Sequence, residues 1–286
     1  MNKVFTIKNT TYLNPPKDYD DESLYPSFQE KLDLFKIEIL KSVSNLDAKT
    51  YFRFGDGDYY FLNKIPKGSA KPGKRALKIS YSKLDHQPFV DNYVKNDKYA
   101  ALITPSSISN FRSMLQKEPD FPIEVFYGLL SNKWLFENIS GKIGIIGAKP
   151  KIKIIKKLME HEEYKDYLRL DRFDDYLSID QNFACDNLEK TRKKLFKQLE
   201  KSKSNIFLVG IGHVKSGILN EMKNIKPAVY LDVGVGIDAL AGLVNIYRPY
   251  FGSWKNYKVS NARYLYRNAD LLINNFGSLG DLKKLK

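Results

Sequence analysis

Two carboxylates stand two positions apart between glycines in FRFGDGDYYFL, residues 52–62. Asp56 and Asp58 follow a strand-like apolar stretch, and we expect Gly55 and Gly57 to let the backbone turn sharply in a loop there. Mg²⁺ and Mn²⁺ accept carboxylate oxygens and usually share their coordination between the protein and the phosphates of a ligand. The segment therefore predicts either a divalent-metal site beside a charged ligand or a turn whose acids only hydrogen-bond the backbone.

Basic side chains near two strand-like segments could bind the phosphates of such a ligand. Arg53 lies three residues before the first aspartate and could pair with it or reach a phosphate. The segment GIGHVKSG, residues 210–217, places Gly212, His213 and Lys215 between an apolar run and a helical pattern. Free amides at a helix start can bind phosphate, and the lysine adds charge. A plain tight turn and a capping or packed histidine are the structural alternatives.

Strand-like and helix-like segments alternate along most of the chain. Short apolar runs rich in β-branched residues are followed by segments with helical spacing, which is typical of a parallel sheet buried on both faces. We therefore predict an α/β fold: a Rossmann-like, mostly parallel sheet with helices on both faces. Its six strands would be TYFRF, KYAALIT, PIEVFY, GKIGIIG, NIFLVG and AVYLDVG. In such a sheet ligands bind beyond the carboxyl ends of the strands, where both motifs fall.

The first helix and the domain limits follow from local patterns. The stretch PSFQEKLDLFKIEILKSVSNL begins with capping-box spacing and then repeats apolar residues every three or four positions. Residues 1–26 read as a polar leader, residues 27–247 as the Rossmann-like domain, and residues 248–286 as an extension packed on that domain. The Gly-, Pro- and Lys-containing stretch 63–75 predicts a surface loop that could close over a ligand.

Composition limits the class of protein and its compartment. With 43% hydrophobic and 13% aromatic residues among 286, the chain should fold as a globule. A single cysteine, Cys185, excludes an internal disulfide and indicates a reducing compartment. No apolar stretch approaches the roughly 20 residues needed to cross a bilayer, and the start lacks the apolar core of a secretion signal. We expect a cytoplasmic protein that could touch a membrane only peripherally.

The formal net charge of +14 suggests an anionic partner without identifying it. Nucleic acid, anionic lipid and phosphorylated ligands are all attracted by such a charge. In LEKTRKKLFKQLEKSK the lysines lie opposite an apolar stripe, as on a solvated helix face. The segment from residue 248 to 267 mixes basic and aromatic side chains and is the best candidate for nucleic-acid contact. A nucleic-acid-binding or DNA-modifying accessory protein is therefore an alternative function.

The stretch YFRFGDGDYYFL closely resembles the Arg-Phe/Tyr-Gly-Asp-Gly-Glu signature that opens the glycosyltransferases of the GT-D fold. As in that family, an amphipathic helix precedes the motif. The later segments LVGIGHVKSGILNEM and VYLDVGVGIDALAG look like the family's Gly-rich turn and its Asp-hydrophobic-Gly strand. The similarity is sharp at residues 52–62 and looser from residue 208 to residue 242.

This resemblance implies metal-assisted transfer of a sugar from a nucleotide-diphosphate sugar to an acceptor hydroxyl of a glycan, glycoprotein or lipid-linked acceptor. Asp56 matches the family aspartate, and Asp58 stands where glutamate is usual. The pair is associated in the family with a divalent ion, here Mn²⁺ or Mg²⁺, and with the donor diphosphate. Arg53 and Gly55 belong to the same donor-binding motif. The shorter second carboxylate argues against a role that requires glutamate as a base.

Further roles follow from the later segments. Lys215 and the amides around Gly212 and His213 are predicted to contact the diphosphate or the acceptor. Asp232 or Asp238 could accept the proton of the acceptor hydroxyl, because both lie near the end of a predicted strand. Asp238 could instead cap the helix DALAGLV. A folded relative without catalytic activity is a further alternative.

Overall fold

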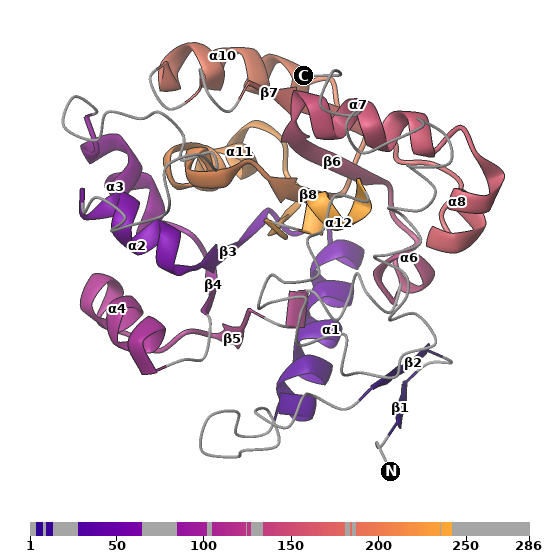
Figure 1. Ribbon diagram of the computed structural model, residues 1–286, viewed down its shortest axis with the longest axis horizontal. Coiled ribbons are helices and arrows are strands. Elements are labelled where there is room, and N and C mark those ends of the chain that lie inside the picture. The colour runs from indigo at the N-terminus through magenta and orange to yellow at the C-terminus, as the bar shows by residue number, and fades with distance from the viewer. Residues whose placement is uncertain are drawn as a thin grey trace, which may run out of the picture.

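The computed structural model describes residues 4–7, 10–13, 28–64, 85–101, 105–123, 125–126, 134–180, 184, 187–234 and 236–241. These residues form a seven-stranded sheet with helices around it and a separate two-stranded antiparallel hairpin (Figure 1). The hairpin, β1 (Val4–Ile7) and β2 (Thr10–Leu13), lies inside the stretch predicted as a leader. The predicted extension 248–286, its candidate nucleic-acid segment, most of the predicted loop 63–75 and Cys185 lie outside the described residues.

Every strand pair of the large sheet is parallel, in the order β5-β4-β3-β9-β8-β6-β7. The predicted Rossmann-like α/β fold is therefore confirmed. The strands are β3 (Lys49–Phe54), β4 (Lys98–Ala101), β5 (Phe121–Pro122), β6 (Ile143–Ala148), β7 (Asp175–Ile179), β8 (Ile206–Gly210) and β9 (Val229–Asp232).

Two details of the strand prediction are wrong. The segment PIEVFY is not a strand, because only Phe121–Pro122 pairs with β4 and residues 125–126 are helical. The edge strand β7 was not predicted, since DYLSI is buried at only two of its five positions and lacks the continuous apolar run of the inner strands.

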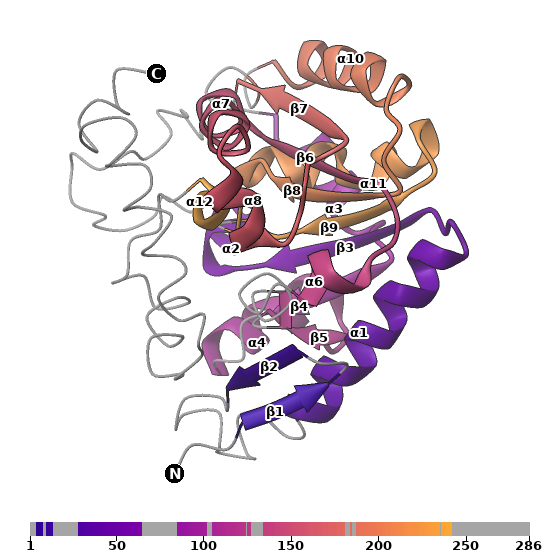
Figure 2. The ribbon, with the colours of Figure 1, turned by 90° about the vertical axis from the view of Figure 1, so that its right-hand side faces the viewer.

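Helices connect the strands and cover both faces of the sheet (Figure 2). Their bounds are α1 (Phe28–Ser44), α2 (Asp56–Leu62), α3 (Gln87–Tyr93), α4 (Pro105–Leu115), α6 (Trp134–Asn138), α7 (Lys149–Leu158), α8 (Glu162–Leu168), α10 (Leu188–Leu199), the 3₁₀ turn η2 (Gly212–Val214), α11 (Lys215–Ile225) and α12 (Gly236–Leu240). Within the described part of the chain, no helix combines the length and apolar character that a bilayer crossing requires.

Alternate residues of the inner strands enter two separate hydrophobic cores. Tyr51 packs with residues of α1, α7 and α8 on one face, whereas Phe52 and Phe54 pack with residues of α2, α3, α10 and α11 on the other. Because successive side chains of a strand point to opposite faces, a strand buried on both sides needs apolar residues at consecutive positions. This requirement explains why the inner strands were recognisable from sequence.

Strands β3 and β9 lie side by side, and the helices that follow them enter different hydrophobic cores, α2 through Phe61 and α12 through Ile237. From β3 the chain builds β4 and β5 on one side, and it then forms β6 to β9 on the other side. Connections that leave neighbouring strands in opposite directions open a crevice beyond their carboxyl ends, where ligands bind in open parallel sheets. The two segments that end there are RFGDGD after β3 and DVGVG after β9.

Candidate functional site at the ends of β3 and β9

Asp232 ties together the ends of the two central strands. Its Oδ2 accepts a hydrogen bond of 3.1 Å from the Arg53 backbone N–H, and its Oδ1 accepts one of 3.1 Å from Gly234 N–H. Asp232 is 1% exposed. The Asp232 carboxylate thus accepts backbone N–H groups from the ends of both strands, β3 and β9, where the hydrogen bonding of the sheet stops.

Asp58 lies in a helix rather than in the predicted loop. The chain enters α2 immediately after Gly55, which has extended backbone with φ −127° and ψ 172°, so no left-handed conformation is needed there. Asp58 occupies the third helical position, and its Oδ2 accepts the Gly55 N–H at 2.9 Å. An acid at this position satisfies a free amide and interacts favourably with the helix dipole. The predicted loop is therefore wrong, and Asp58 makes the backbone hydrogen bond of the structural alternative together with an ion pair to Lys215.

Lys215 is buried between the two carboxylates. Its Nζ lies 2.6 Å from Asp232 Oδ2 and 3.1 Å from Asp58 Oδ2, and it also donates to the backbone carbonyl of Arg53. The ammonium stands 4.3 Å from the centre of the Phe52 ring, and Lys215 is only 2% exposed. An ammonium has three protons. Lys215 donates to Asp232 Oδ2 and to the Arg53 carbonyl and forms an ion pair with Asp58, so these buried partners hold its ammonium in place.

The charges around Asp58 keep its carboxyl ionised. Burial by itself would raise the pKa of Asp58, but the positive charge of Lys215 opposes it, and His213 and then Arg53 add to that effect. The net result is a pKa well below the usual range of an aspartate. Asp58 therefore stays ionised at neutral pH beside the buried ion pair of Lys215 with Asp232.

His213 lies beside this network and is more accessible than Lys215. Its ring stacks on Phe61 of α2 with centroids 4.7 Å apart and planes 7° apart, and its side chain is 23% exposed. Its Nδ1 is 3.8 Å from Asp58 Oδ1, beyond hydrogen-bond distance. Gly57 leaves room for the ring, because a Cβ there would approach His213 Cε1 to 3.2 Å.

Two glycines shape the turns of the site. Gly212, at the start of η2, has φ +60°, a conformation that side chains rarely adopt. Gly234, after β9, has φ +48°, and a Cβ there would lie 2.3 Å from Arg53 Nη2. Gly234 therefore makes the space in which the guanidinium of Arg53 lies. Neither Gly234 nor Phe61 was selected from the sequence, although Gly234 belongs to the DVG segment that resembles the family element.

The donor set fits a shared metal site rather than a cage made by the protein alone. The structure describes the backbone of Asp56 at the first position of α2 but not its side chain. No group of three or more His, Cys, Asp or Glu residues in the described ranges is placed to hold a metal ion. Asp58 offers an ionised carboxylate, whose Oδ1 lies 3.8 Å from His213 Nδ1. Mg²⁺ commonly binds one or two carboxylates and completes its coordination with substrate phosphates.

Asp238 lies at the same edge of the sheet but outside the Lys215 network. It is in the first turn of α12, which follows β9, and it forms an ion pair with Lys151 near the start of α7. Its side chain is 17% exposed, whereas that of Asp232 is 1% exposed. Of the two aspartates predicted as proton acceptors, Asp238 is therefore the more accessible.

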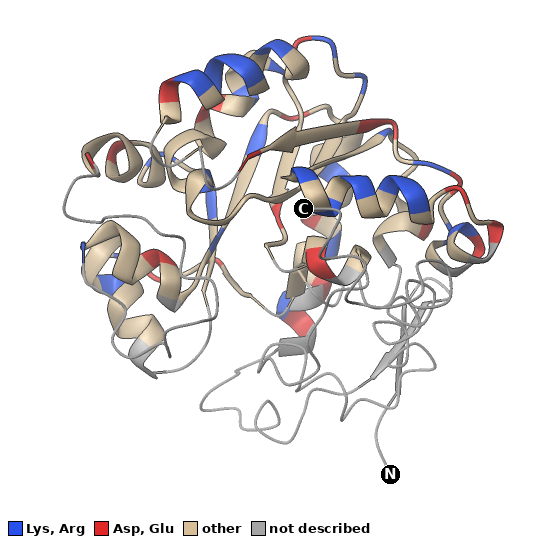
Figure 3. Cartoon of the chain, turned by 45° about the horizontal axis from the view of Figure 1, so that its top comes forward, with Lys and Arg blue, Asp and Glu red and all other residues tan. Residues whose placement is uncertain are grey.

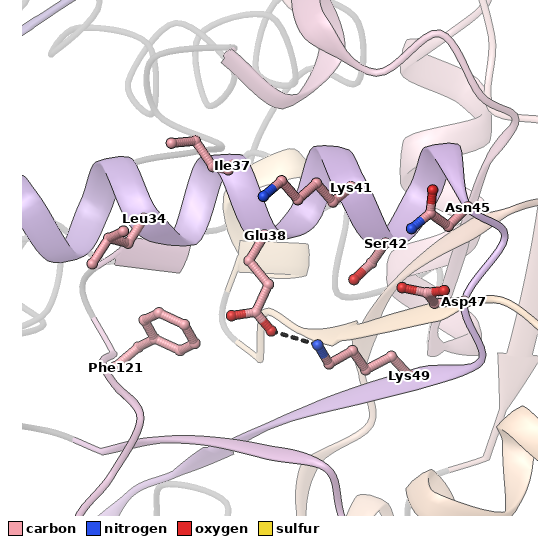
Figure 4. Close-up of a pocket in the computed structure, with 9 residues that line it drawn as sticks. All are labelled: Leu34, Ile37, Glu38, Lys41, Ser42, Asn45, Asp47, Lys49 and Phe121. Carbon is pink, nitrogen blue, oxygen red and sulfur yellow. Dashed lines mark hydrogen bonds and ion pairs between the residues drawn. The ribbon is translucent and has the colours of Figure 1, made fainter.

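A groove of about 520 Å³ lies elsewhere, between α1 and the β5 end of the sheet (Figure 4). Its lining includes the exposed side chains of Leu34 and Ile37 and the ion pair of Glu38 with Lys49 at 2.7 Å. Lys49 begins β3, so this groove is at the opposite end of that strand from Arg53. None of the predicted site residues lines it.

The fold and the cluster define an α/β protein with a charged site at the carboxyl ends of two neighbouring parallel strands. Comparison with family models, with curated proteins and with solved structures found no match to this chain.

Proposed function

We propose that this protein is a glycosyltransferase that takes a sugar from a nucleotide-diphosphate donor and passes it to an acceptor hydroxyl. One observation carries the proposal: Asp58, from the segment that resembles the glycosyltransferase signature, meets Lys215 and Asp232 at the carboxyl ends of β3 and β9. Two separate segments with family resemblance thus converge where ligands bind in such sheets.

Arg53 and His213 are the groups that we assign to the donor diphosphate. Both are only partly buried, and both border the ion network of Lys215. A guanidinium can donate two parallel hydrogen bonds to phosphate oxygens. Lys215 and Asp232 would then act by holding the ends of the strands and Asp58 in place.

Asp56 and Asp58 are the residues proposed to hold Mn²⁺ or Mg²⁺ together with the donor phosphates. A bound divalent ion would offset the negative charge that grows on the departing diphosphate. Within the chain, the network around Asp58 supports this role by keeping one carboxylate ionised. The network also limits it, because Asp58 Oδ2 already accepts a hydrogen bond from Gly55 N–H and is paired with the Lys215 ammonium.

Asp238 is proposed as the general base that accepts the acceptor's proton. Asp232 is less suited, because both of its oxygens already accept hydrogen bonds inside the buried network. Asp238 is partly exposed, and its partner Lys151 orients its carboxylate. The acceptor would be a glycan, a glycoprotein or a lipid-linked sugar, and the reaction would take place in the cytoplasm.

A panel of nucleotide sugars, each with and without Mn²⁺, tests the proposal. A donor that binds the native state should raise the melting temperature, and slow hydrolysis of the donor should accompany binding. We expect Arg53→Gln and Asp56→Asn to abolish the donor-dependent shift. Asp171→Asn, which changes an exposed aspartate on the loop before β7, is the matched control and should retain it.

Three outcomes would count against the glycosyltransferase proposal. No shift with any nucleotide sugar would overturn the proposal. If cells that carry Asp56→Asn behave as wild-type cells do, the protein would be better explained as a relative of glycosyltransferases without catalytic activity. Steeply salt-dependent binding of an oligonucleotide, without nucleotide-sugar binding, would favour the nucleic-acid alternative.

A further inference from the structure

A surface of lysines borders the β7 edge of the sheet. Helices α7 and α10 both pack against β7, and their apolar sides enter the two different cores, so they lie on opposite faces of this edge strand (Figures 1 and 2). Both helices carry many basic residues at this end of the molecule (Figure 3). The exposed lysines that we call the basic edge are Lys149 and Lys153 of α7 and Lys190, Lys193, Lys194 and Lys197 of α10.

The spacing of these lysines places them on the outward face of each helix. On α10 they recur at the first, fourth, fifth and eighth positions of the series, opposite the buried Leu188, Leu195 and Leu199. Like charges three or four residues apart destabilise an isolated helix. An anionic surface brought against the helix would relieve this repulsion.

The basic edge differs from the other basic residues on the same helices, which have partners within the fold. Lys151 and Lys157 of α7 and Arg192 of α10 each form an ion pair with a nearby acid. By contrast, the lysines of the basic edge form no ion pair with any acid in the part of the chain that the structure describes. Their charge is therefore available to a partner.

We propose that the basic edge binds the surface of a membrane rich in anionic lipid. Its charges are all lysines, whose ammonium groups attract an anionic surface without requiring a fixed binding geometry. A nucleic-acid groove would combine arginines or lysines with aromatic rings on which bases stack. The aromatic rings at this edge, Tyr176 of β7 and Phe196 of α10, are packed against the two cores and only partly exposed, so they offer no open platform for bases. The proposal does not rest on the glycosyltransferase assignment.

Sedimentation with lipid vesicles, in the absence of donor and acceptor, tests this surface. We expect the full-length protein to bind vesicles that contain about 30% phosphatidylglycerol in phosphatidylcholine and not vesicles of phosphatidylcholine alone. Binding should weaken as salt is raised from about 0.1 M to about 0.5 M, because the attraction is screened. The variant with Lys193→Gln, Lys194→Gln and Lys197→Gln should bind about 10- to 100-fold more weakly.

A second triple variant controls for net charge. Lys41→Gln, Lys64→Gln and Lys95→Gln remove the same charge from exposed lysines on other elements, and this variant should bind as the wild type does. Equal loss in both variants would show that overall charge, not the basic edge, governs binding. That result would overturn the proposal, as would absence of binding to anionic vesicles. Tighter binding to an oligonucleotide that displaces the protein from vesicles would also overturn it, in favour of a nucleic-acid partner.

Discussion

Replacing Lys215 by methionine should be one of the most damaging single changes in this protein. The substitution keeps a long apolar side chain over Phe52 but removes the ammonium that lies 2.6 Å from Asp232 and 3.1 Å from Asp58. Asp58 and Asp232 are at least 96% buried, and each would lose its ammonium partner while keeping its backbone amide donors. Removing one partner of a buried charged network typically costs about 3–5 kcal/mol of the free energy of unfolding.

The loss in the free energy of unfolding should depend on pH in a defined direction. In the wild type the pKa of Asp58 is held below its unfolded value, so its ionisation stabilises the fold above about pH 4, and this contribution is lost as the pH falls through the folded pKa. Without Lys215, the largest of the charges that oppose burial is lost, so the pKa of Asp58 rises from its wild-type value. Ionisation of Asp58 then stabilises the variant less than it stabilises the wild type, so the difference in the free energy of unfolding should be widest near neutral pH and should narrow as the pH falls below about 4.

Urea denaturation of both proteins at several pH values measures this gap. The double variant Lys215→Met with Asp232→Asn is the control, because removing the second charge should recover part of the loss. Two results would refute this account. One is a loss of less than about 1 kcal/mol in the free energy of unfolding of Lys215→Met, and the other is a double variant whose loss equals the sum of the losses of Lys215→Met and Asp232→Asn alone. If the variant stays stable but no longer binds any nucleotide sugar, Lys215 contacts the ligand and does not merely position the site.

Three further changes test individual parts of the fold and site. Gly234→Ala should destabilise the protein by about 1–3 kcal/mol and displace Arg53, because the position has φ +48° and no room for a Cβ; thermal unfolding and donor binding measure the two effects. Asp175→Asn should cost about 1–3 kcal/mol, since Asp175 Oδ2 accepts four hydrogen bonds from residues 202–204. The pKa of Asp175 is lowered, in spite of burial, by these donors, so the difference from wild type should shrink as the pH falls below about 4 in urea titrations. Asp238→Asn should lower kcat about 100-fold or more while donor affinity is kept, and an unchanged kcat would exclude it as the base.

Local sequence was enough to find the inner sheet and most of the helices. Strands such as β6 and β8 are buried on both faces, so their apolar runs are continuous and readable. The apolar stripe of Leu188, Leu195, Phe196 and Leu199 likewise predicted α10; the three leucines are buried and Phe196 is partly buried. Parallel strands alternating with helices then implied where the motif segments would lie.

Local sequence misread α2 because two glycines near its start lower helix propensity. The helix forms because Asp58 accepts the Gly55 amide and Phe61 packs in the core under His213. Part of this support comes from His213 and Lys215, which lie more than 150 positions later in the chain, so the sequence around α2 alone could not reveal it.

The sequence by itself determined the α/β class, the order of most elements and the positions of the motif residues, because hydrophobic periodicity and turn chemistry act over a few residues. Only the tertiary structure decided that Lys215 is enclosed by Asp58, Asp232 and the carbonyl of Arg53. Strands β3 and β9 are neighbours in the sheet, so their carboxyl ends lie together although 178 positions separate Phe54 from Asp232 in the chain. A lysine at the carboxyl ends of strands can bind a ligand or a neighbouring carboxylate. Which of the two it binds depends on how deeply its ammonium is buried and on its distances to the carboxylates, and both are set by the packing of β3 against β9.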